Sequence, residues 1–511
     1  MSKVAKIFTA ATVGLDSYLV EVETDIGAGL PSFTIVGLPD KAIDESKERI
    51  RAAIKNSGVF FTQHRLTINL APADIKKEGP SFDLPMAVGI LLAGEQFDYI
   101  DEFKKALFIG ELSLNGELRH VNGVLPITLF AVEKGYERIY LPAVNAEEAS
   151  LIKGIEIIPV KSLNQLIKHL RSEEIIKSYK AKSLRQKVEN QKESQFDFKY
   201  IAGQEQVKRA LEIAAAGGHN ILLSGPPGSG KTLLARSIPT ILPEMDDEEI
   251  IEVMKIYSVS GMLNSGTLIL DRPFRSPHHT TSSVAIVGGG TWPRPGEISL
   301  SHRGILFLDE FPEFPRSVLE SLRQPLEDGI VTVSRATGSL TFPAKFLLVA
   351  AQNPCPCGFL SDPEKHCTCT PTQIIRYQKK VSGPILDRID IHIEVPRVKY
   401  AKLSEESVAE ASESVRRRIE QARELQRKRF EGTGIKTNAE MSSREIKAYC
   451  KLEEAGEKII GQAVESMKLS ARVYHRLLKL ARTIADLENS EQITAGNIAE
   501  ALQYRPKEKT Y

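Results

Sequence analysis

The stretch that most constrains this chain is a run of glycines and prolines that ends in a lysine and a threonine. An apolar segment, 220–223, precedes the run, and Leu233, Leu234 and Ile238 follow it at helical spacing. The run consists of Gly225, Pro226, Pro227, Gly228, Ser229, Gly230, Lys231 and Thr232. A glycine-rich loop between a strand and a helix turns its backbone N–H groups toward phosphate oxygens, and the helix N-terminus adds partial positive charge. The sequence therefore predicts a site for a nucleoside triphosphate.

Two side chains at the end of this loop have predicted roles. Lys231 is placed to reach the β- and γ-phosphates, and the hydroxyl of Thr232 is placed to hold Mg²⁺. A glycine-rich turn without a ligand is the alternative interpretation. The order of strand, loop and helix favours the ligand site, so we expect ATP and Mg²⁺ as cofactors.

Two further strands are predicted to bring polar groups to the same place. The apolar segment 304–308 ends in Asp309 and Glu310, and ligands of parallel α/β sheets bind at the carboxyl ends of strands. Asp309 is predicted to order Mg²⁺ and Glu310 to polarise the attacking water. A third strand, 346–350, leads to Asn353, which we expect to touch the γ-phosphate. A turn-forming asparagine is the alternative.

Length and composition limit what the rest of the chain can be. With 511 residues it is too long for one core, and 42% hydrophobic and 26% charged residues are typical of a soluble globular protein. The net charge of +1 restricts any contact with nucleic acid to local basic patches. No apolar run reaches the roughly 18 residues of a membrane span, and the N-terminal stretch lacks the pattern of a secretion signal. We expect a cytoplasmic protein with no membrane partner.

Changes of pattern along the chain predict its domain organisation. Residues 1–170 mix strands and helices, and 171–196 form a charged linker. Residues 197–398 carry the nucleotide motifs in an α/β core, and 399–511 are mostly helical. The expected fold class is α/β, with a helical C-terminal lid.

The first of these domains resembles the Lon protease domain, an α+β fold of the ribosomal S5 domain 2-like type. Segment 76–81 (KKEGPS) matches the serine loop, and 110–117 (GELSLNGE) matches a second Lon-like stretch. In those proteases a lysine just beyond the second stretch activates the serine, and Leu125 occupies that position here. A serine needs an adjacent base to become a nucleophile. We therefore predict a Lon-like domain without the peptidase dyad, in which Ser81 caps a helix.

The nucleotide motifs resemble those of AAA+ ATPases, with Asn353 in the sensor-1 position. An insertion rich in Gly, Pro and His at 274–303 and a predicted β-hairpin at 328–345 resemble the branch that contains magnesium chelatases, MoxR proteins and the MCM helicases. The chain as a whole resembles the YifB/ComM family of magnesium chelatase-like proteins. This resemblance rests on the Lon-like domain together with the stretches GEISLSHRGILFLDEF, NPCPCG and SGPILDRIDIHIEV. The resemblance covers almost the whole chain.

This resemblance implies further site residues. Arg388 stands where these ATPases carry an arginine that points into the neighbouring subunit's site, where it stabilises charge on the γ-phosphate. A surface salt bridge to Asp387 or Asp390 is the alternative. Arg472 stands in the sensor-2 position and is implied to contact the γ-phosphate, with an exposed arginine at a helix start as its alternative.

The family also implies partners and an activity. It implies a hexameric ring that works as a branch-migration helicase on single-stranded or branched DNA, in recombination or natural transformation. A chelatase- or MoxR-type motor that remodels a protein partner is the alternative. In a ring, the insertion and the hairpin would face DNA with Arg275, His278, His279, Trp292, Arg294, Arg335 and Lys345.

Four of the five cysteines follow the third predicted strand closely. Cys355, Cys357, Cys367 and Cys369 have the spacing C-x-C-x₉-C-x-C, and four thiolates can bind Zn²⁺ tetrahedrally. Pairs of the form C-x-C are less standard than C-x-x-C, so four reduced thiols are the alternative, and His366 could replace one ligand. Four protein ligands leave no open position for chemistry. The spacing therefore predicts a structural zinc that stiffens a loop.

Overall fold

A computed structural model gives the fold, and it describes residues 4–74, 76–97, 101–180, 195–263, 268–290, 293–335, 338–360, 362, 364–398 and 409–505. The chain divides into two compact units, Met1–Glu189 with Ile250–Ile269, and Asn190–Glu249 with Leu270–Tyr511. Most of the predicted linker, 171–196, lies outside the described residues. The predicted domain boundaries stay predictions.

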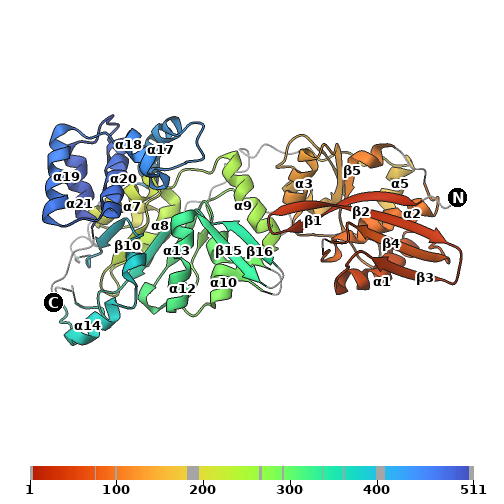
Figure 1. The fold of residues 1–511 in the computed structure, drawn as a ribbon, viewed down its shortest axis with the longest axis horizontal. Helices are drawn as coiled ribbons and strands as arrows, with labels where there is room; N and C mark the ends of the chain where they lie inside the picture. The colour runs from red at the N-terminus through yellow and green to blue at the C-terminus, as the bar shows by residue number, and fades with distance from the viewer. Residues whose placement is uncertain are drawn as a thin grey trace. The chain divides into compact units, whose positions relative to one another are not determined.

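The first unit is built on a mixed sheet of seven strands in the order β3-β4-β2-β1-β5-β8-β9 (Figure 1). The strands are β1 (Ala5–Val13), β2 (Asp16–Gly27), β3 (Ser32–Val36), β4 (Arg65–Ala71), β5 (Ala106–Phe108), β8 (Arg138–Pro142) and β9 (Glu156–Val160). The hairpin β1–β2 is antiparallel, whereas β1, β5, β8 and β9 run parallel. Parallel neighbours need crossover connections, and helices supply them.

Helices pack on this sheet through buried apolar side chains. They are α1 (Lys41–Asn56), α2 (Asp83–Ala93), α3 (Val124–Glu133), α4 (Ala146–Ala149) and α5 (Leu163–Leu170). Helix α1 is amphipathic, with Ile43, Ile50 and Ile54 buried, and its N-cap Asp40 accepts a hydrogen bond from the Ile43 N–H at 2.8 Å. Helix α2 is apolar nearly all round, and ten of its eleven residues are buried. It is therefore the central helix of this core.

The two Lon-like stretches lie side by side. The Gly110 N–H donates to the Ser81 carbonyl at 2.9 Å, and the Leu84 N–H donates to the Gly110 carbonyl at 2.9 Å. The predicted capping role of Ser81 is wrong. Pro80 starts a short 3₁₀ turn, Pro80–Phe82, that runs directly into α2, whose N-cap is Phe82 without a side-chain bond. The turn continues into the helix, so Ser81 lies before the capping position.

The position of the missing protease lysine holds a buried residue. Leu125 lies in α3, and its N–H donates to the Glu148 carboxylate at 3.2 Å. Burial raises the pKa of Glu148, and hydrogen bonds from Ser258, Asn145 and the Leu125 backbone oppose that shift. Leu125 has no basic group, so it cannot activate Ser81.

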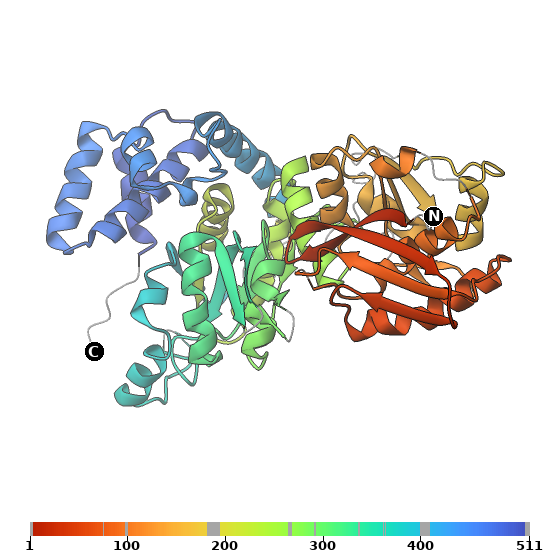
Figure 2. The same ribbon diagram turned by 45° about the vertical axis from the view of Figure 1, so that its right-hand side comes forward.

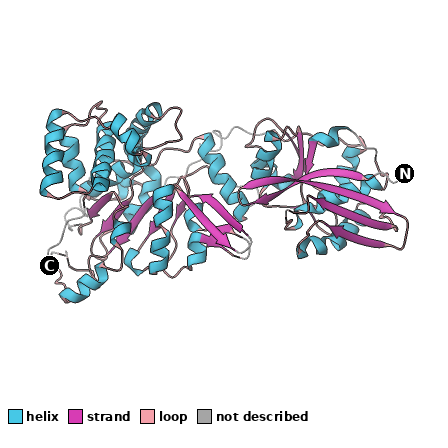
Figure 3. Ribbon diagram, viewed as in Figure 1, coloured by secondary structure: helices cyan, strands magenta, loops and turns pink. Residues whose placement is uncertain are grey.

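The second unit contains a parallel sheet of five strands in the order β11-β14-β17-β10-β18 (Figure 3). The strands are β10 (Ile221–Ser224), β11 (Phe274–Arg275), β14 (Ile305–Leu308), β17 (Leu347–Gln352) and β18 (Ile391–Glu394). All run in one direction, so the loops after β10, β14 and β17 meet at one edge. The three strands predicted from apolar segments are confirmed, as is the parallel α/β fold class.

Helices α7 (Glu205–Gly217) and α8 (Lys231–Ile241) flank β10 in the chain, and the helical C-terminal region shares a buried core with them. That region contains α17 (Ser412–Arg429), α18 (Ser443–Tyr449), α19 (Glu454–Ser466), α20 (Ala471–Leu487) and α21 (Ala495–Gln503), which gather in one bundle in Figure 2. The predicted helical C-terminal region is confirmed. Within the described residues, no helix combines the length and apolar character needed to cross a bilayer.

Helix α17 carries two basic clusters, 416–418 and 427–429. Arg416 donates to the Thr240 carbonyl, Arg418 pairs with Glu212, and Arg429 pairs with Asp486. The other three basic residues are exposed. The contacts favour a structural role for Arg416, Arg418 and Arg429.

The two inserted features have defined structure. The insertion 274–303 contains β11, α10 (Ser283–Val287), a small β-hairpin and α11 (Glu297–Leu300). The predicted hairpin is confirmed as β15 (Ile330–Arg335) paired antiparallel with β16 (Gly338–Pro343). Its tip, 336–337, lies outside the described residues.

Candidate functional site

The loop between β10 and α8 has the shape that phosphate binding requires. Gly230 has φ +89° and forms the N-cap of α8, in a left-handed conformation that favours glycine. Gly225 is needed for a different reason, because a Cβ atom there would lie 2.3 Å from the Val395 carbonyl oxygen. The loop therefore lies tightly against the end of β18 and opens at the N-terminus of α8.

Lys231 is held by this loop and by the neighbouring strand. Its ammonium donates to the carbonyls of Gly225 and Pro226 at 2.8 and 2.9 Å and to the Asn353 side-chain oxygen at 3.3 Å. Lys231 is 9% exposed. Burial lowers the pKa of Lys231, and the nearby charge of Asp309 opposes the shift. The ammonium is therefore positioned where a compact cation meets phosphate oxygens.

Thr232 and Asp309 are brought together from two elements. The Thr232 hydroxyl, in the first turn of α8, donates to an Asp309 carboxylate oxygen at 2.8 Å just after β14. A hydroxyl and a carboxylate are hard oxygen donors of the kind that Mg²⁺ takes, and Mg²⁺ is usually held by few protein oxygens together with substrate phosphates. The residues present fit the ion that the sequence predicts.

Glu310 follows Asp309 in a conformation unusual for a non-glycine residue, with φ +52°. Its backbone N–H donates to the Asp309 side chain at 2.9 Å. Its carboxylate, 56% exposed, contacts His279 Nδ1 at 3.0 Å. Strained backbone is typical of functional sites. In this conformation the Glu310 side chain contacts the insertion through His279.

Arg388 and Arg472 lie together elsewhere. Both donate to the carboxylate of Glu327 in α13 (Arg323–Asp328), Arg472 at 3.0 Å. Arg388, 9% exposed, precedes β18, whereas the phosphate loop follows β10. These strands are parallel neighbours, so the two arginines and Lys231 belong to opposite edges of one sheet.

A buried polar network holds this second edge. The Asn220 amide donates to the Arg388 carbonyl at 3.1 Å, and its oxygen accepts from the Leu348 N–H at 2.9 Å. His219 contacts the Asp390 carboxylate at 3.2 Å and the Thr483 hydroxyl at 2.8 Å. Burial, the largest single cause, would raise the pKa of Asp390, but the hydrogen bond and charge of His219 together with the charges of Arg476 and Lys479 outweigh it, so the pKa is lowered. The network fixes the start of β18 against β10 and α20.

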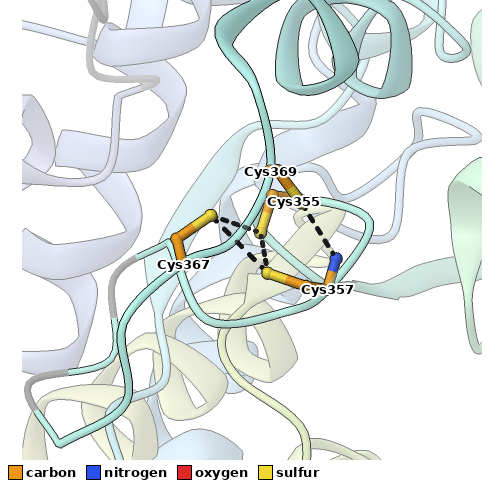
Figure 4. A group of neighbouring side chains, drawn as sticks. All are labelled: Cys355, Cys357, Cys367 and Cys369. Atoms are coloured by element: carbon orange, nitrogen blue, oxygen red, sulfur yellow. Dashed lines mark hydrogen bonds between the residues drawn. The ribbon is translucent and has the colours of Figure 1, made fainter.

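The four predicted cysteines come together in the loop after β17 (Figure 4). Their sulfur atoms all lie within 4.8 Å of one another. His366, the alternative ligand, is outside this group. The clustering of the four cysteines is therefore as the spacing predicted, and zinc itself stays a prediction.

The side chains predicted to face DNA have varied surroundings. Arg275 forms two hydrogen bonds with Glu297 at 2.6 Å, and Lys345 pairs with Glu440 at 2.9 Å. His278 and Arg294 are exposed. Trp292 and the side chain of Arg335 lie outside what the structure describes.

Sequence reasoning missed three residues that touch the site. His279, which we expect to face DNA, also contacts the Glu310 carboxylate, and its contact with DNA stays a prediction. Glu327, which holds both arginines, had no motif to mark it. Gly358 lies against Pro227 of the phosphate loop, since a Cβ atom there would approach Pro227 to 2.5 Å. The only sequence signals for these contacts were that His279 lies in the insertion and that Gly358 lies between the two cysteine pairs.

Family models match almost the whole chain. A model described as magnesium chelatase, subunit ChlI, matches 197–403, one described as subunit ChlI of Mg-chelatase matches 22–145, and one described as magnesium chelatase, subunit ChlI C-terminal, matches 409–505.

Individual relatives show how far each likeness extends. The chain is 43% identical to competence protein ComM of Haemophilus influenzae, over 98% of this chain and 97% of the relative. It is 42% identical to YifB of Escherichia coli, over 98% and 96%. A magnesium-chelatase subunit ChlI of Guillardia theta is 25% identical, over 43% of this chain and 62% of the relative.

Proposed function

Because this chain belongs to the YifB/ComM family of magnesium chelatase-like AAA+ ATPases, we propose that it assembles into a hexameric ring and acts on DNA as a branch-migration helicase. The ring is supported by one observation: Lys231 lies at one edge of the sheet, whereas Arg388 and Arg472 lie at the opposite edge. DNA as the substrate is supported by full-length similarity to a competence protein. The cytoplasm, where ATP and DNA are both present, is the proposed location.

The nucleotide half of the mechanism uses the loop and three side chains. Backbone N–H groups of Gly225–Thr232 surround the phosphates, and Lys231 exchanges its carbonyl partners for phosphate oxygens. Thr232 and Asp309 would hold Mg²⁺, and the ion would supply positive charge to offset that of the phosphates. Asn353, already 3.3 Å from the Lys231 ammonium, is placed to bond the γ-phosphate. The zinc predicted at the four cysteines takes no part in hydrolysis in this mechanism.

The hydrolytic half uses Glu310 and arginines from the neighbouring subunit. Glu310 orients the water that attacks the γ-phosphate, and its contact with His279 keeps the carboxylate on the insertion until the site is complete. Since Arg388 and Arg472 lie at the edge opposite the phosphate loop, a ring would bring them to the next subunit's nucleotide. There they stabilise charge that develops on the γ-phosphate.

A motor that remodels a protein partner is the second candidate. It is favoured by the three matching family models, all described by the chelatase subunit ChlI. The extent of the likeness favours the first candidate, because ComM aligns over 98% of this chain and the algal chelatase subunit over 43%.

ATP hydrolysis measured with and without DNA decides between the two candidates. We expect single-stranded or four-way-junction DNA to stimulate steady-state hydrolysis, and the stimulation to fade as salt rises, because phosphate contacts release counterions. Duplex of the same length is the matched comparison. Normal basal hydrolysis without a response to any DNA would move the assignment to the protein-remodelling motor.

His279→Ala should uncouple hydrolysis from DNA. Removing the 3.0 Å contact frees Glu310, so basal hydrolysis should rise by up to about fivefold, corresponding to an exposed pair worth roughly 1 kcal/mol. The ratio of DNA-stimulated to basal rate should fall. His64→Ala is the control, because His64 is an exposed histidine of the first unit; His278 is unsuitable because its ring lies 4.1 Å from that of His279. A basal rate equal to that of the unmodified protein would remove His279 from this role.

A further inference from the structure

The four clustered cysteines have a geometry that suits one tetrahedral metal ion. Cys355 and Cys357 sulfurs are 3.4 Å apart, Cys355 and Cys367 are 3.7 Å apart, and Cys357 and Cys367 are 3.5 Å apart. Tetrahedral Zn–S bonds of about 2.3 Å place sulfurs about 3.8 Å apart. The described sulfurs are therefore close to the spacing of zinc ligands, and the cysteines are free thiols rather than disulfides.

The surroundings also suit a metal–thiolate site. The Cys357 N–H donates to the Cys369 sulfur at 3.4 Å, and such hydrogen bonds orient the thiolates that bind a metal. Cys355 is fully buried, and the other three are partly buried. Figure 4 shows the sulfurs of Cys355, Cys357 and Cys367 turned toward one another, with Cys369 beside them. Four ligands from the chain close the coordination shell, which is typical of a structural zinc.

The loop between the two cysteine pairs, 358–366, is also tied to the end of β18. Arg397 pairs with Asp362 at 3.0 Å, and its guanidinium lies 5.9 Å from the centre of the Phe359 ring. The loop is thus joined to the sheet at the cysteines and at Arg397.

This cysteine loop lies directly against the nucleotide site. Gly358 has φ +84°, and a Cβ atom on it would lie 2.5 Å from Cδ and 2.7 Å from Cγ of Pro227. Asn353, which contacts Lys231, stands two residues before Cys355 in the chain. A change in the position of the cysteine loop would therefore reach the phosphate loop at Pro227 and would also move Asn353.

We propose that Cys355, Cys357, Cys367 and Cys369 bind one Zn²⁺ and that the closed loop holds Gly358 against Pro227, so that zinc occupancy sets the affinity of the phosphate loop for nucleotide. Without the ion, the two cysteine pairs have only weak contacts between thiols, and the loop loses its fixed position. This inference rests on nucleotide binding at Gly225–Thr232 and is independent of DNA as the substrate.

The metal is tested on the full-length protein after dialysis against metal-free buffer. We expect mass spectrometry of the metals to find one zinc per chain, and Cys367→Ser to lose it. Cys450→Ala is the control, since Cys450 is buried outside the cluster; it should keep its zinc. An unmodified protein without zinc, or a Cys367→Ser protein that keeps its zinc in full, would overturn the site.

The coupling is tested by titrating a fluorescent ADP analogue without DNA or turnover. Cys367→Ser should bind about tenfold more weakly, the effect of losing one packing contact of roughly 1.4 kcal/mol. Gly358→Ala should keep its zinc and also bind more weakly, because its methyl group displaces Pro227. Gly432→Ala is the matched control, with a similar φ of +76° and nothing within 4 Å.

Each variant gives a decisive result. Gly358→Ala that binds nucleotide as tightly as Gly432→Ala would refute the coupling even if zinc is present. If Cys367→Ser does not fold, the affinity of the unmodified protein for the analogue before and after EDTA removes the zinc, and again after Zn²⁺ is restored, still decides the proposal; equal affinities with and without zinc would overturn it. If DNA does not stimulate hydrolysis but the protein holds zinc and its zinc content changes its affinity for nucleotide, the proposed DNA motor is wrong and this inference is supported.

Discussion

Glu310→Gln is expected to bind ATP normally and to lose hydrolysis by about 10²- to 10⁴-fold, the usual contribution of a positioned base. Glutamine keeps the size of the side chain but removes the negative charge that polarises water. Thr232, Asp309 and Lys231 are untouched, so the phosphates and Mg²⁺ should still be held. Steady-state turnover and binding of a fluorescent nucleotide are measured on the same preparation.

Glu313→Gln is the matched control for that variant. Glu313 is a nearby acidic residue whose carboxylate pairs with Lys380 at 2.7 Å. Its replacement should leave turnover near normal. Turnover of Glu310→Gln within about twofold of the unmodified protein would exclude Glu310 as the base, since a base contributes at least about 100-fold.

The second large effect is expected from mixing two inactive proteins. Lys231→Ala removes the cation at the phosphate loop, and Arg388→Ala removes the arginine proposed to serve the neighbouring site, which contributes about 10³- to 10⁵-fold in related transfers. Each protein alone should be inactive. A mixture should recover activity, because an Arg388→Ala subunit keeps its Lys231 and receives Arg388 from its neighbour. With random assembly about a quarter of interfaces are complete.

The control for mixing is Lys231→Ala combined with a chain that carries both substitutions. No interface in that mixture has an intact phosphate loop, so activity should stay at background. If Lys231→Ala and Arg388→Ala fail to rescue each other at every ratio, while gel filtration shows mixed rings, Arg388 does not act between subunits. Arg472→Ala, mixed in the same way, extends the test to the second arginine.

The loop of the predicted nucleotide site could be predicted because its shape depends on local sequence. Gly230 and Lys231 are adjacent, and the backbone conformation that the glycine permits places the lysine at a helix start. Asp309 and Asn353 are distant from the loop in the chain. They were still predictable, because the carboxyl ends of parallel strands meet at one edge.

The residues that sequence missed depend on contacts that no local pattern encodes. Glu327 meets Arg388 and Arg472 across 61 and 145 residues of chain. His279 reaches Glu310 from an insertion whose fold has no periodic signal. The prediction that Ser81 caps a helix is wrong because the 3₁₀ turn that starts at Pro80 continues directly into α2. In each case the outcome depended on tertiary packing rather than on spacing.

In the proposed ring, the shared carboxylate of Glu327 would give a preference among nucleotides. The single negative charge of Glu327 offsets only one of the two positive charges of Arg388 and Arg472. A neighbouring nucleotide would therefore gain both arginines only by competing with that carboxylate. The terminal phosphate of ATP carries a high negative charge density, so it can compete with Glu327 for the two arginines. ADP lacks this phosphate and would compete less well. Subunits should therefore adhere most strongly while ATP is intact and loosen after cleavage. One glutamate would thus make the cohesion of the ring depend on the energy charge of the cell.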